Sequence, residues 1–484
     1  MTSAPPRPAT LPEAHAVIEA LWAEHARLRE VAARLETQLQ ELEARLGQNS
    51  ANSSQPPSAD PPQAPPRPPQ PSAGRRRGAQ PGHPAHRRSL LPPEEVDASL
   101  DHWPAVCQHC QTPLAPDPAQ AVGEPIRHQV VEVPPLRAEV SDHYLHRLRC
   151  PRCGGETRAG LPPAVPPGAF GPRLQAVIAL LSSRYRLSRR EVAAVCADLL
   201  GVDIAVGSVD ALCQVTAQAL AAPVAALQAA VQQAEVVNAD ETQWRLAGQR
   251  CWLWVAVSAV ATVFTVATSR GSTVIKGLLG EPFAGVLGSD RWSAYSWVAP
   301  QHRQVCWAHL KRDFQALVDR GGAARPIGEA ALALLARLFD AWHHARDDPA
   351  ARARLPVTLA PLQAEFRTLL EEGTASESTK AAGLCRALLK LWPALWTFVT
   401  APGVEPTNNV AERAIRPAVL WRKGSFGSQS AAGAEFVARM LSVTATCRQQ
   451  GRPLLAYLTA VCTAAQCGHP IPPLLPELPH APAV

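Results

Sequence analysis

The stretch EVVNADETQWRL, residues 235–246, opens a series of strand-like segments in the middle of the chain. The series continues with RCWLWVAVSA (250–259), TVFTVATSRG (262–271) and FAGVLGSDRWSAY (283–295), which are rich in the Val, Thr, Trp and Phe that favour strands. The segment HRQVCWAHLKRDFQALV (302–318) then adds a strand and a basic helix. Strands in hairpin order, followed by strands that alternate with helices, predict a mixed α/β sheet.

Two aspartates, Asp240 and Asp290, stand at the expected ends of the first and fourth segments, where side chains of an open α/β sheet meet in one crevice. Neighbouring carboxylates repel each other unless a cation lies between them, and Mg²⁺ prefers such oxygen ligands. A third carboxylate, Glu412, lies on an expected helix within PTNNVAERAIRPAVLWRK (406–423). Three carboxylates predict a two-metal site for phosphoryl transfer. The ordinary alternatives are aspartates that cap loops and a salt bridge from Glu412 to Arg416.

Composition excludes several classes of protein. The chain has 484 residues, 47 Lys and Arg against 41 Asp and Glu, and 12 dispersed cysteines, which are too dilute for a disulfide scaffold. The N-terminus MTSAPPRP lacks the apolar core of a signal peptide. The uncharged run 251–269 contains several Ser and Thr, and two strands explain it better than one membrane span. We therefore expect a soluble, multidomain, cytoplasmic protein.

A heptad repeat occupies residues 11–47. Apolar seams sustained over four heptads predict a coiled coil, and hence a homo-oligomer, in preference to a helix packed on its own protein. The two seams consist of Leu21, Leu28, Leu35 and Leu42, and of Ile18, His25, Ala32, Leu39 and Leu46.

Residues 48–99 form a Pro-rich linker that we expect to be disordered. Positive charge on such an arm suits a DNA backbone or minor groove, although a solvated charge run would have the same composition. The arginines concerned are Arg75, Arg76, Arg77, Arg87 and Arg88.

Two Cys-x-x-Cys pairs in residues 100–160 are typical of a structural Zn²⁺ site. Cys107 with Cys110 and Cys150 with Cys153 can supply four thiolates in a tetrahedral arrangement. The runs HQVVEV and AEVSDHYLHRLRC between them are strand-like, which fits a zinc ribbon with a β insertion. Disulfide or redox pairs are the alternatives. The other eight cysteines are expected to be buried free thiols.

Residues 171–222 are expected to be helical and could form a helix-turn-helix. Ser188 and Glu191 make a capping box, Gly201 ends that helix, and Ser208 is expected to cap the next one. Any helical hairpin has the same pattern, so DNA reading by this element stays open.

The gap between Asp290 and Glu412 is long. The intervening stretch from about 321 to 400 has helical periodicity. We therefore expect a catalytic domain over 230–450 with a helical insertion, followed by a C-terminal helix and Pro-rich tail over 451–484.

Four blocks resemble those of bacterial DDE transposases of the insertion sequence sixty-six family: ADETQWR, GSDRWSAY, CWAHLKRDF and PTNNVAERAIRPAVLWRKGSFGS. The order of zipper, basic linker, paired cysteines and catalytic domain is also similar to that family, so the resemblance covers nearly the whole chain. It implies an RNase H-like fold, Asp240, Asp290 and Glu412 as the DDE triad, Mg²⁺ or Mn²⁺ as cofactor, and DNA transposition by cleavage and joining. An Asn often follows the Arg-Lys pair in the family, whereas Gly424 follows it here.

The resemblance further implies that DNA, as transposon end and as target, is the partner, in the nucleoid-associated cytoplasm of a bacterium. Accessory proteins of the same element are further candidate partners. Two other functions remain open, a non-catalytic DNA-binding accessory protein and an RNase H-like nuclease that cuts without joining. Residues expected to contact phosphates are His309, Lys311, Arg312, Arg413, Arg416, Arg422 and Lys423.

Overall fold

The computed structural model describes residues 10–46 and 88–475, without the side chains of 37–46. The chain divides into a smaller unit, 68–140 with 199–201, and a larger unit that contains the remainder. Several predictions lie outside the described residues. They concern Arg75, Arg76, Arg77 and Arg87, the linker from 48 to 87, the seam side chains of Leu39, Leu42 and Leu46, and the tail from 476 onward.

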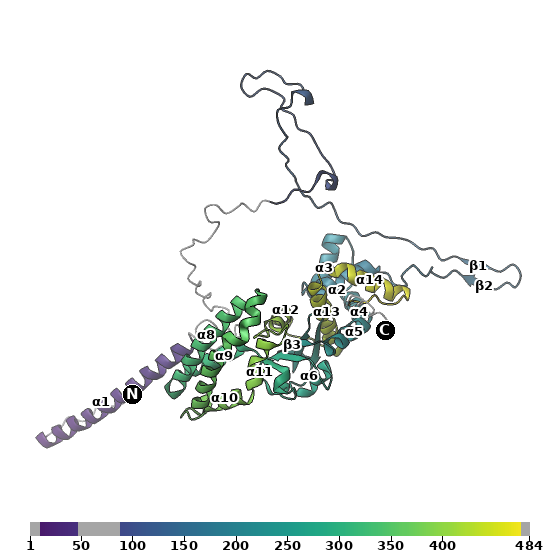
Figure 1. Cartoon of the computed structure of the whole chain (residues 1–484). Coiled ribbons are helices and arrows are strands. Elements are labelled where there is room, and N and C mark those ends of the chain that lie inside the picture. Colours follow the sequence, from purple (N-terminus) through teal and green to yellow (C-terminus); the bar gives the residue numbers. More distant parts are fainter. Residues whose placement is uncertain (1–9, 47–87, 476–484) are drawn as a thin grey trace. The chain divides into compact units, whose positions relative to one another are not determined.

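A five-stranded mixed sheet lies within the larger unit (Figure 1). Its strands run in the order β5-β4-β3-β6-β7, with β3, β4 and β5 antiparallel and with β6 and β7 parallel to β3. They are β3 (Val236–Leu246), β4 (Gln249–Val257), β5 (Thr262–Ala267), β6 (Val286–Ser289) and β7 (Arg303–Val305). The predicted mixed α/β sheet is thus confirmed, and the uncharged run 251–269 supplies β4 and β5.

Eight helices pack with the sheet around one hydrophobic core, in which Trp244 and Trp254 are fully buried. Their buried positions recur at helical spacing, as in α4, where Val209, Cys213 and Ala217 face inward. The helices are α2 (Pro172–Ser183), α3 (Arg189–Leu200), α4 (Val206–Ala219), α5 (Ala221–Gln232), α6 (Ser272–Leu279), α12 (Asn409–Ser425), α13 (Ala431–Gln449) and α14 (Leu454–Cys467).

A second hydrophobic core belongs to the helices between β7 and α12. The ring of Trp307 lies 5.4 Å from that of Phe366 and 5.1 Å from that of Trp396, measured between centroids. The helices are α7 (Trp307–Arg320), α8 (Arg325–Ala345), α9 (Pro349–Gly373), α10 (Thr379–Lys390) and α11 (Trp392–Thr400). The long gap between Asp290 and Glu412 is therefore a separately packed helical body.

Helices cover both edges of the sheet. On β5, the Phe264 backbone N–H donates to Ser442 Oγ of α13 at 2.8 Å. On β7, Thr397 Oγ1 of α11 donates to the carbonyl of Arg303 at 2.5 Å. Unpaired strand edges otherwise invite pairing with other chains, so these contacts fix the sheet at five strands.

Of the two helix starts predicted within residues 171–222, one is confirmed and the other is wrong. The capping box is confirmed, since Ser188 N–H donates to Glu191 Oε2 at 2.7 Å and Glu191 N–H to Ser188 Oγ at 3.2 Å. The cap at Ser208 is wrong, because α4 already begins at Val206 with Ala205 as its N-cap residue. An earlier start lets Val209 face the core from within the helix.

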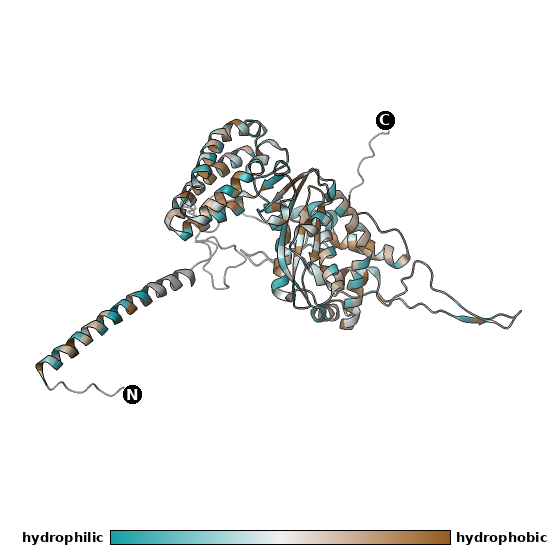
Figure 2. Ribbon diagram, turned by 90° about the horizontal axis from the view of Figure 1, so that it is seen from below, coloured by the Kyte–Doolittle hydropathy of each residue, from teal (hydrophilic) through white to brown (hydrophobic). Residues whose placement is uncertain are grey.

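The N-terminal helix α1 (Leu11–Leu46) leaves its heptad leucines exposed. Leu21, Leu28 and Leu35 are 63%, 58% and 56% exposed, and Figure 2 shows hydrophobic and hydrophilic residues interleaved along α1. Within residues 10–46 and 88–475, no single helix is long and apolar enough to cross a membrane. Only α4 and α5 together, a pair bent by 44°, meet those criteria of length and composition.

The strand-like runs between the cysteine pairs are mostly not strands. HQVVEV (128–133) has no regular structure, and of the second run only β1 (Arg147–Arg149) is a strand, paired with β2 (Glu156–Arg158). Val130 and Val131 are 78% and 68% exposed. Their apolar side chains therefore lack a partner surface of the kind that stabilises a strand.

Candidate active site

Asp240 and Asp290 have equivalent positions relative to the pairing of two neighbouring parallel strands, Asp240 within β3 and Asp290 directly after β6. The last residues that β3 and β6 pair with each other are Asn238 and Gly288. Each aspartate lies two residues further along its segment. The expectation that Asp240 ends its strand is wrong, because β3 continues to Leu246 in its pairing with β4. What ends before Asp240 is the pairing with β6. A Cβ at Gly288 would lie 2.4 Å from Asn238 Oδ1, so any larger residue here would force the Asn238 side chain to move.

The carboxylate of Asp240 is electrostatically unfavourable without a cation. Burial raises the pKa of Asp240 well above its ordinary value, and the charges of Glu241, Asp290 and Glu412 raise it further. The structure thus brings Asp290 and Glu412, which come from other parts of the chain, within electrostatic range of Asp240. A divalent cation would offset this repulsion.

Asp290 is held by both its side chain and its main chain. Its Oδ1 accepts a hydrogen bond from the Trp292 backbone N–H at 2.9 Å. Its carbonyl accepts from Arg303 Nη2 at 3.2 Å and from Ser289 Oγ at 2.9 Å. Arg303 is only 2% exposed, and burial lowers its pKa while Asp290 raises it. The main chain of Asp290 is therefore held by a buried arginine that the sequence did not reveal.

Glu412 is in the first turn of α12, and the start of that helix is tied to β3. Asn408, the N-cap residue, makes no side-chain cap. Its Nδ2 instead donates to the carbonyl of Ala239 at 3.2 Å, and its N–H donates to Cys306 Sγ at 3.4 Å. Because Ala239 precedes Asp240, this contact sets the third carboxylate beside the first strand.

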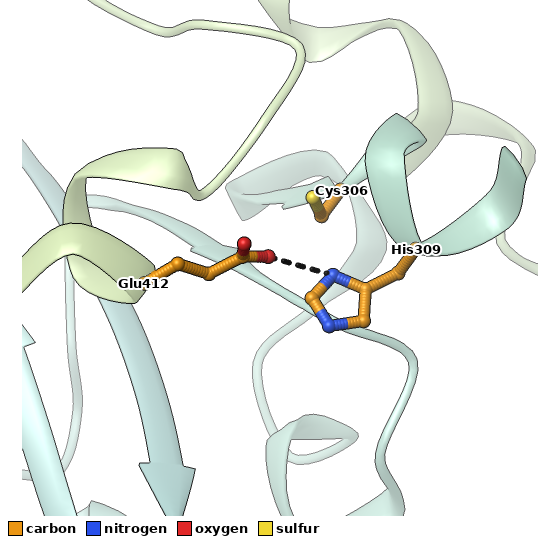
Figure 3. A group of neighbouring side chains, drawn as sticks. All are labelled: Cys306, His309 and Glu412. Carbon is orange, nitrogen blue, oxygen red and sulfur yellow. Dashed lines mark ion pairs between the residues drawn. The ribbon is translucent and has the colours of Figure 1, made fainter. Parts of the chain in front are cut away.

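Glu412 pairs with His309 rather than with Arg416, the alternative suggested by helical spacing. His309 Nδ1 lies 3.3 Å from Glu412 Oε1, and Cys306 lies beside both (Figure 3). Burial lowers the pKa of His309 to about 4, and Arg312 lowers it while Glu412 opposes the shift. Burial also raises the pKa of Cys306 to about 11. At neutral pH the imidazole and the thiol are therefore uncharged.

A buried ion pair lies next to Asp240, and sequence reasoning missed it. The Glu241 side chain is 1% exposed, and its Oε1 lies 2.7 Å from Arg270 Nη2. Tyr295 donates its hydroxyl to Glu241 Oε2, and Arg270 stacks 4.0 Å from the Trp292 ring centroid. Burial raises the pKa of Glu241. The alternation of side chains along a strand could have revealed this ion pair. Adjacent strand residues point to opposite faces of the sheet, so Glu241, next to Asp240, needs a charged partner on its own face.

The predicted phosphate-contacting cations differ in their surroundings. Arg422 Nη1 donates to Thr242 Oγ1 at 3.0 Å and to the carbonyl of Gln243, so it anchors α12 to β3. Arg312 is half-buried near His309, and Arg88 of the linker donates to the carbonyl of Gln129 at 2.9 Å. The exposed members are Lys311, Arg413, Arg416 and Lys423.

Both Cys-x-x-Cys pairs lie in turns with one hydrogen-bond pattern. In each turn the first cysteine donates its N–H to the carbonyl five residues on, at 2.9 Å for Cys107 and 2.8 Å for Cys150. Each also accepts from the N–H four residues on at 2.9 Å, where Gln111 and Gly154 have left-handed φ values of 61° and 72°. The two turns belong to different units of the chain.

Hydrogen bonds favour the thiolate in one cysteine of each turn. The pKa of Cys110 is lowered chiefly by the side chain of Thr112, and that of Cys150 chiefly by the backbone of Cys153. Thiolates are the form that binds metals. Of the other eight cysteines, Cys467 is half-buried, and the expected burial as free thiols is confirmed for Cys196, Cys213, Cys251, Cys306, Cys385, Cys447 and Cys462.

Comparison with known proteins shows which family the sequence matches. Residues 167–436 match the transposase IS66 family, and residues 3–89 match a family of unknown function, DUF6444. Two uncharacterized proteins of Sinorhizobium fredii (strain NBRC 101917 / NGR234) are also similar. Protein y4qI is 28% identical over 273 residues, which are 50% of this chain and 49% of y4qI. Protein y4hP is 26% identical over 396 residues, 74% of this chain and 70% of y4hP. The aligned region thus spans about half the length of y4qI.

Proposed function

The chain belongs to the transposase IS66 family, and on that premise we propose that it cuts DNA at transposon ends and joins those ends to target DNA. Membership of a transposase family makes DNA its partner in general terms. The observation that carries the finer proposal is that Asp290, directly after β6, and Glu412 of α12 lie within electrostatic range of Asp240 on β3.

We assign the catalytic domain, residues 230–450, to the RNase H-like class. The support is the strand order, in which three antiparallel strands are followed by two parallel ones on the far side of β3. Asp240 then lies on the central strand and Asp290 after its parallel neighbour, where a crevice is expected. The helices from α8 to α11 form the proposed insertion.

The three carboxylates fit a hard divalent cation. All three donors are oxygens, and burial, together with the charges of Glu241, Asp290 and Glu412, raises the pKa of Asp240, which supports a cation as the partner of this carboxylate. We assign Asp240, Asp290 and Glu412 as the residues that would hold Mg²⁺ or Mn²⁺. When bound, such ions activate an attacking hydroxyl and offset charge on the phosphate.

The proposed reaction has two steps at this site. Water attacks the phosphorus of the phosphodiester at the transposon end. The bond between that phosphorus and the 3′ oxygen of the transposon strand breaks, and this oxygen takes up a proton to become a free 3′ hydroxyl. That hydroxyl then loses its proton, attacks a target phosphodiester and displaces the target's 3′ oxygen. The exposed cations Lys311, Arg413, Arg416 and Lys423 would hold phosphates, whereas Arg422 would position α12 through its contact with β3.

The N-terminal parts complete the proposal. The leucines of α1 would join copies of the chain into a homo-oligomer, because an exposed apolar seam is stabilised when a second helix covers it. The paired cysteines, Cys107 with Cys110 and Cys150 with Cys153, would serve as ligands of structural Zn²⁺, and the matching hydrogen-bond pattern of their turns supports this role. The arginines of the linker would add non-specific attraction to DNA.

A joining assay tests the proposed function. The full chain, a labelled transposon-end duplex and a plasmid target are incubated with Mg²⁺, and products are separated under denaturing conditions. Labelled strands covalently joined to plasmid are the expected result. Cut duplex without joined product would favour a nuclease, and binding without cutting would favour an accessory protein. Joining that persists in Asp290→Asn would overturn the triad.

A further inference from the structure

Cys306, His309 and Glu412 bring three different metal-ligand types to one point (Figure 3). Cys306 follows β7 directly and is the N-cap residue of α7, and His309 is in the first turn of that helix. Glu412 is in the first turn of α12. The cluster is therefore held by the starts of two helices that are far apart in sequence.

The donor atoms are close enough to share one ion. The sulfur, a ring nitrogen and a carboxylate oxygen all lie within 4.8 Å of one another. In the described part of the chain, His309 Nδ1 and Glu412 Oε1 are buried atoms without a well-formed hydrogen bond, although they are 3.3 Å apart. Cys306 itself is fully buried. Buried polar atoms normally have hydrogen-bond partners, so these two atoms have room for a further ligand such as a metal ion.

The donor set selects a different metal from the catalytic carboxylates. Zn²⁺ accepts sulfur, nitrogen and oxygen ligands, and sites with three protein ligands keep a fourth position for water. Thiolate ligands favour Zn²⁺, whereas all-oxygen sites suit Mg²⁺. We propose that Cys306, His309 and Glu412 form a Zn²⁺ site distinct from the paired-cysteine module. Binding releases the Cys306 thiol proton to solvent as the sulfur–zinc bond forms.

The site has a consequence for the reaction through its shared ligand. Zinc held through Glu412 Oε1 would leave one carboxylate oxygen of Glu412 for the catalytic cation. Zinc at this site would therefore reduce what the third carboxylate contributes to a cation at Asp240 and Asp290. This consequence rests on the proposed function of Glu412, whereas the binding of zinc does not.

Metal content tests the site directly. Full-length chain and variants are incubated with Zn²⁺, freed of loosely bound metal by gel filtration, and analysed for zinc per chain. Wild type is expected to retain one more zinc than Cys306→Ser, His309→Gln or Glu412→Gln. The paired cysteines are present in every sample, so their zinc cancels in the comparison. Equal zinc in wild type and all three variants overturns the proposal and leaves a simple His309–Glu412 contact.

Matched controls separate loss of the site from loss of the fold. Cys251→Ser replaces a buried thiol of β4 and His302→Gln an exposed histidine, and both are expected to keep the wild-type zinc content. If Cys306→Ser fails to fold by circular dichroism, His309→Gln decides the matter, since its side chain is 23% exposed. Loss of zinc in the controls as well would count against the site.

Cobalt provides a readout of the sulfur ligand. With Co²⁺ in place of Zn²⁺, thiolate-to-metal charge-transfer absorption is expected to be weaker in Cys306→Ser than in Cys251→Ser. Equal absorption would overturn the assignment of Cys306 as a ligand. Neither measurement involves DNA, so failure of the proposed transposase activity would leave both results interpretable.

Discussion

Asp240 and Asp290 have matching positions, each two residues beyond the last residues that the parallel strands β3 and β6 pair with each other. The charge of Asp290 raises the pKa of Asp240, in addition to the larger effect of burial. Such an arrangement costs stability unless a cation compensates it. Stability without metal therefore reports on the site independently of catalysis.

Asp240→Asn is expected to stabilise the metal-free chain. Because burial and neighbouring carboxylates raise the pKa of Asp240, its favourable contribution is present below the unfolded-state pKa and is lost as pH rises through the folded-state pKa. At neutral pH the asparagine avoids this loss. We expect the Tm in EDTA to rise by roughly 2–4 °C, the effect of about 1 kcal/mol in a domain of this size.

Measuring the Tm in EDTA at several pH values tests the direction of the pKa shift of Asp240. The Tm difference between Asp240→Asn and wild type is expected to shrink as pH falls toward the ordinary aspartate range. Mg²⁺ is expected to raise the Tm of wild type more than that of the variant. Identical melting of the two proteins in EDTA at neutral pH would argue against a strained carboxylate cluster.

Arg270 is expected to be a major stabilising residue of the site. Arg270→Ala leaves Glu241 buried without its cation, which typically costs about 3–5 kcal/mol in unfolding free energy. Arg270→Lys keeps the charge and should lose less. The control is Arg325→Ala, which breaks an exposed pair with Glu329 and should change the unfolding free energy by less than about 1 kcal/mol. Equal urea midpoints for the two alanine variants would contradict this account.

The exposed seam of α1 is expected to determine oligomeric state. Replacing Leu21 and Leu28 by glutamate places charge on a surface that we propose is covered by a second helix. Light scattering coupled to gel filtration should show a smaller assembly than wild type. Ala26→Glu lies off the seam and should leave the mass unchanged. A monomeric wild type would refute the coiled coil.

Arg416 is expected to contribute to DNA affinity through phosphate contact. Removing one such contact should lower the slope of log affinity against log salt concentration by about 1. Arg416→Ala is compared with Arg354→Ala, an exposed arginine on α9 of the helical body. Fluorescence anisotropy at several salt concentrations measures both slopes. The same slope for Arg416→Ala and wild type would remove Arg416 from the interface.

Local sequence patterns predicted much of the sheet and its surroundings. Strand-forming runs located β3, β4, β5 and β6, and the Ser188–Glu191 spacing located the start of α3. Such features depend on residues close together in sequence, where periodicity and capping chemistry act. The expected strand end is confirmed for Asp290, which directly follows β6, but is wrong for Asp240, which lies within β3.

Long-range contacts could not be predicted in the same way. The bond from Asn408 to Ala239 spans 169 residues, and it decides where Glu412 lies relative to Asp240. The partner of Glu241 is Arg270, which the sequence places in a loop after β5 without indicating its target. HQVVEV looked like a strand because its composition is apolar, but strands also need a surface to cover.

The central claim is that Asp240, Asp290 and Glu412 act together in DNA joining. Strand transfer of a pre-cut transposon end in Mg²⁺ is compared for Asp240→Asn, Asp290→Asn and Glu412→Gln, with Glu405→Gln as an exposed control close to the third carboxylate. We predict that each triad variant loses at least about 10²–10³-fold of the rate, as for removal of a major charge-stabilising group, while Glu405→Gln retains the wild-type rate. Wild-type joining by any one of the three triad variants would contradict the account.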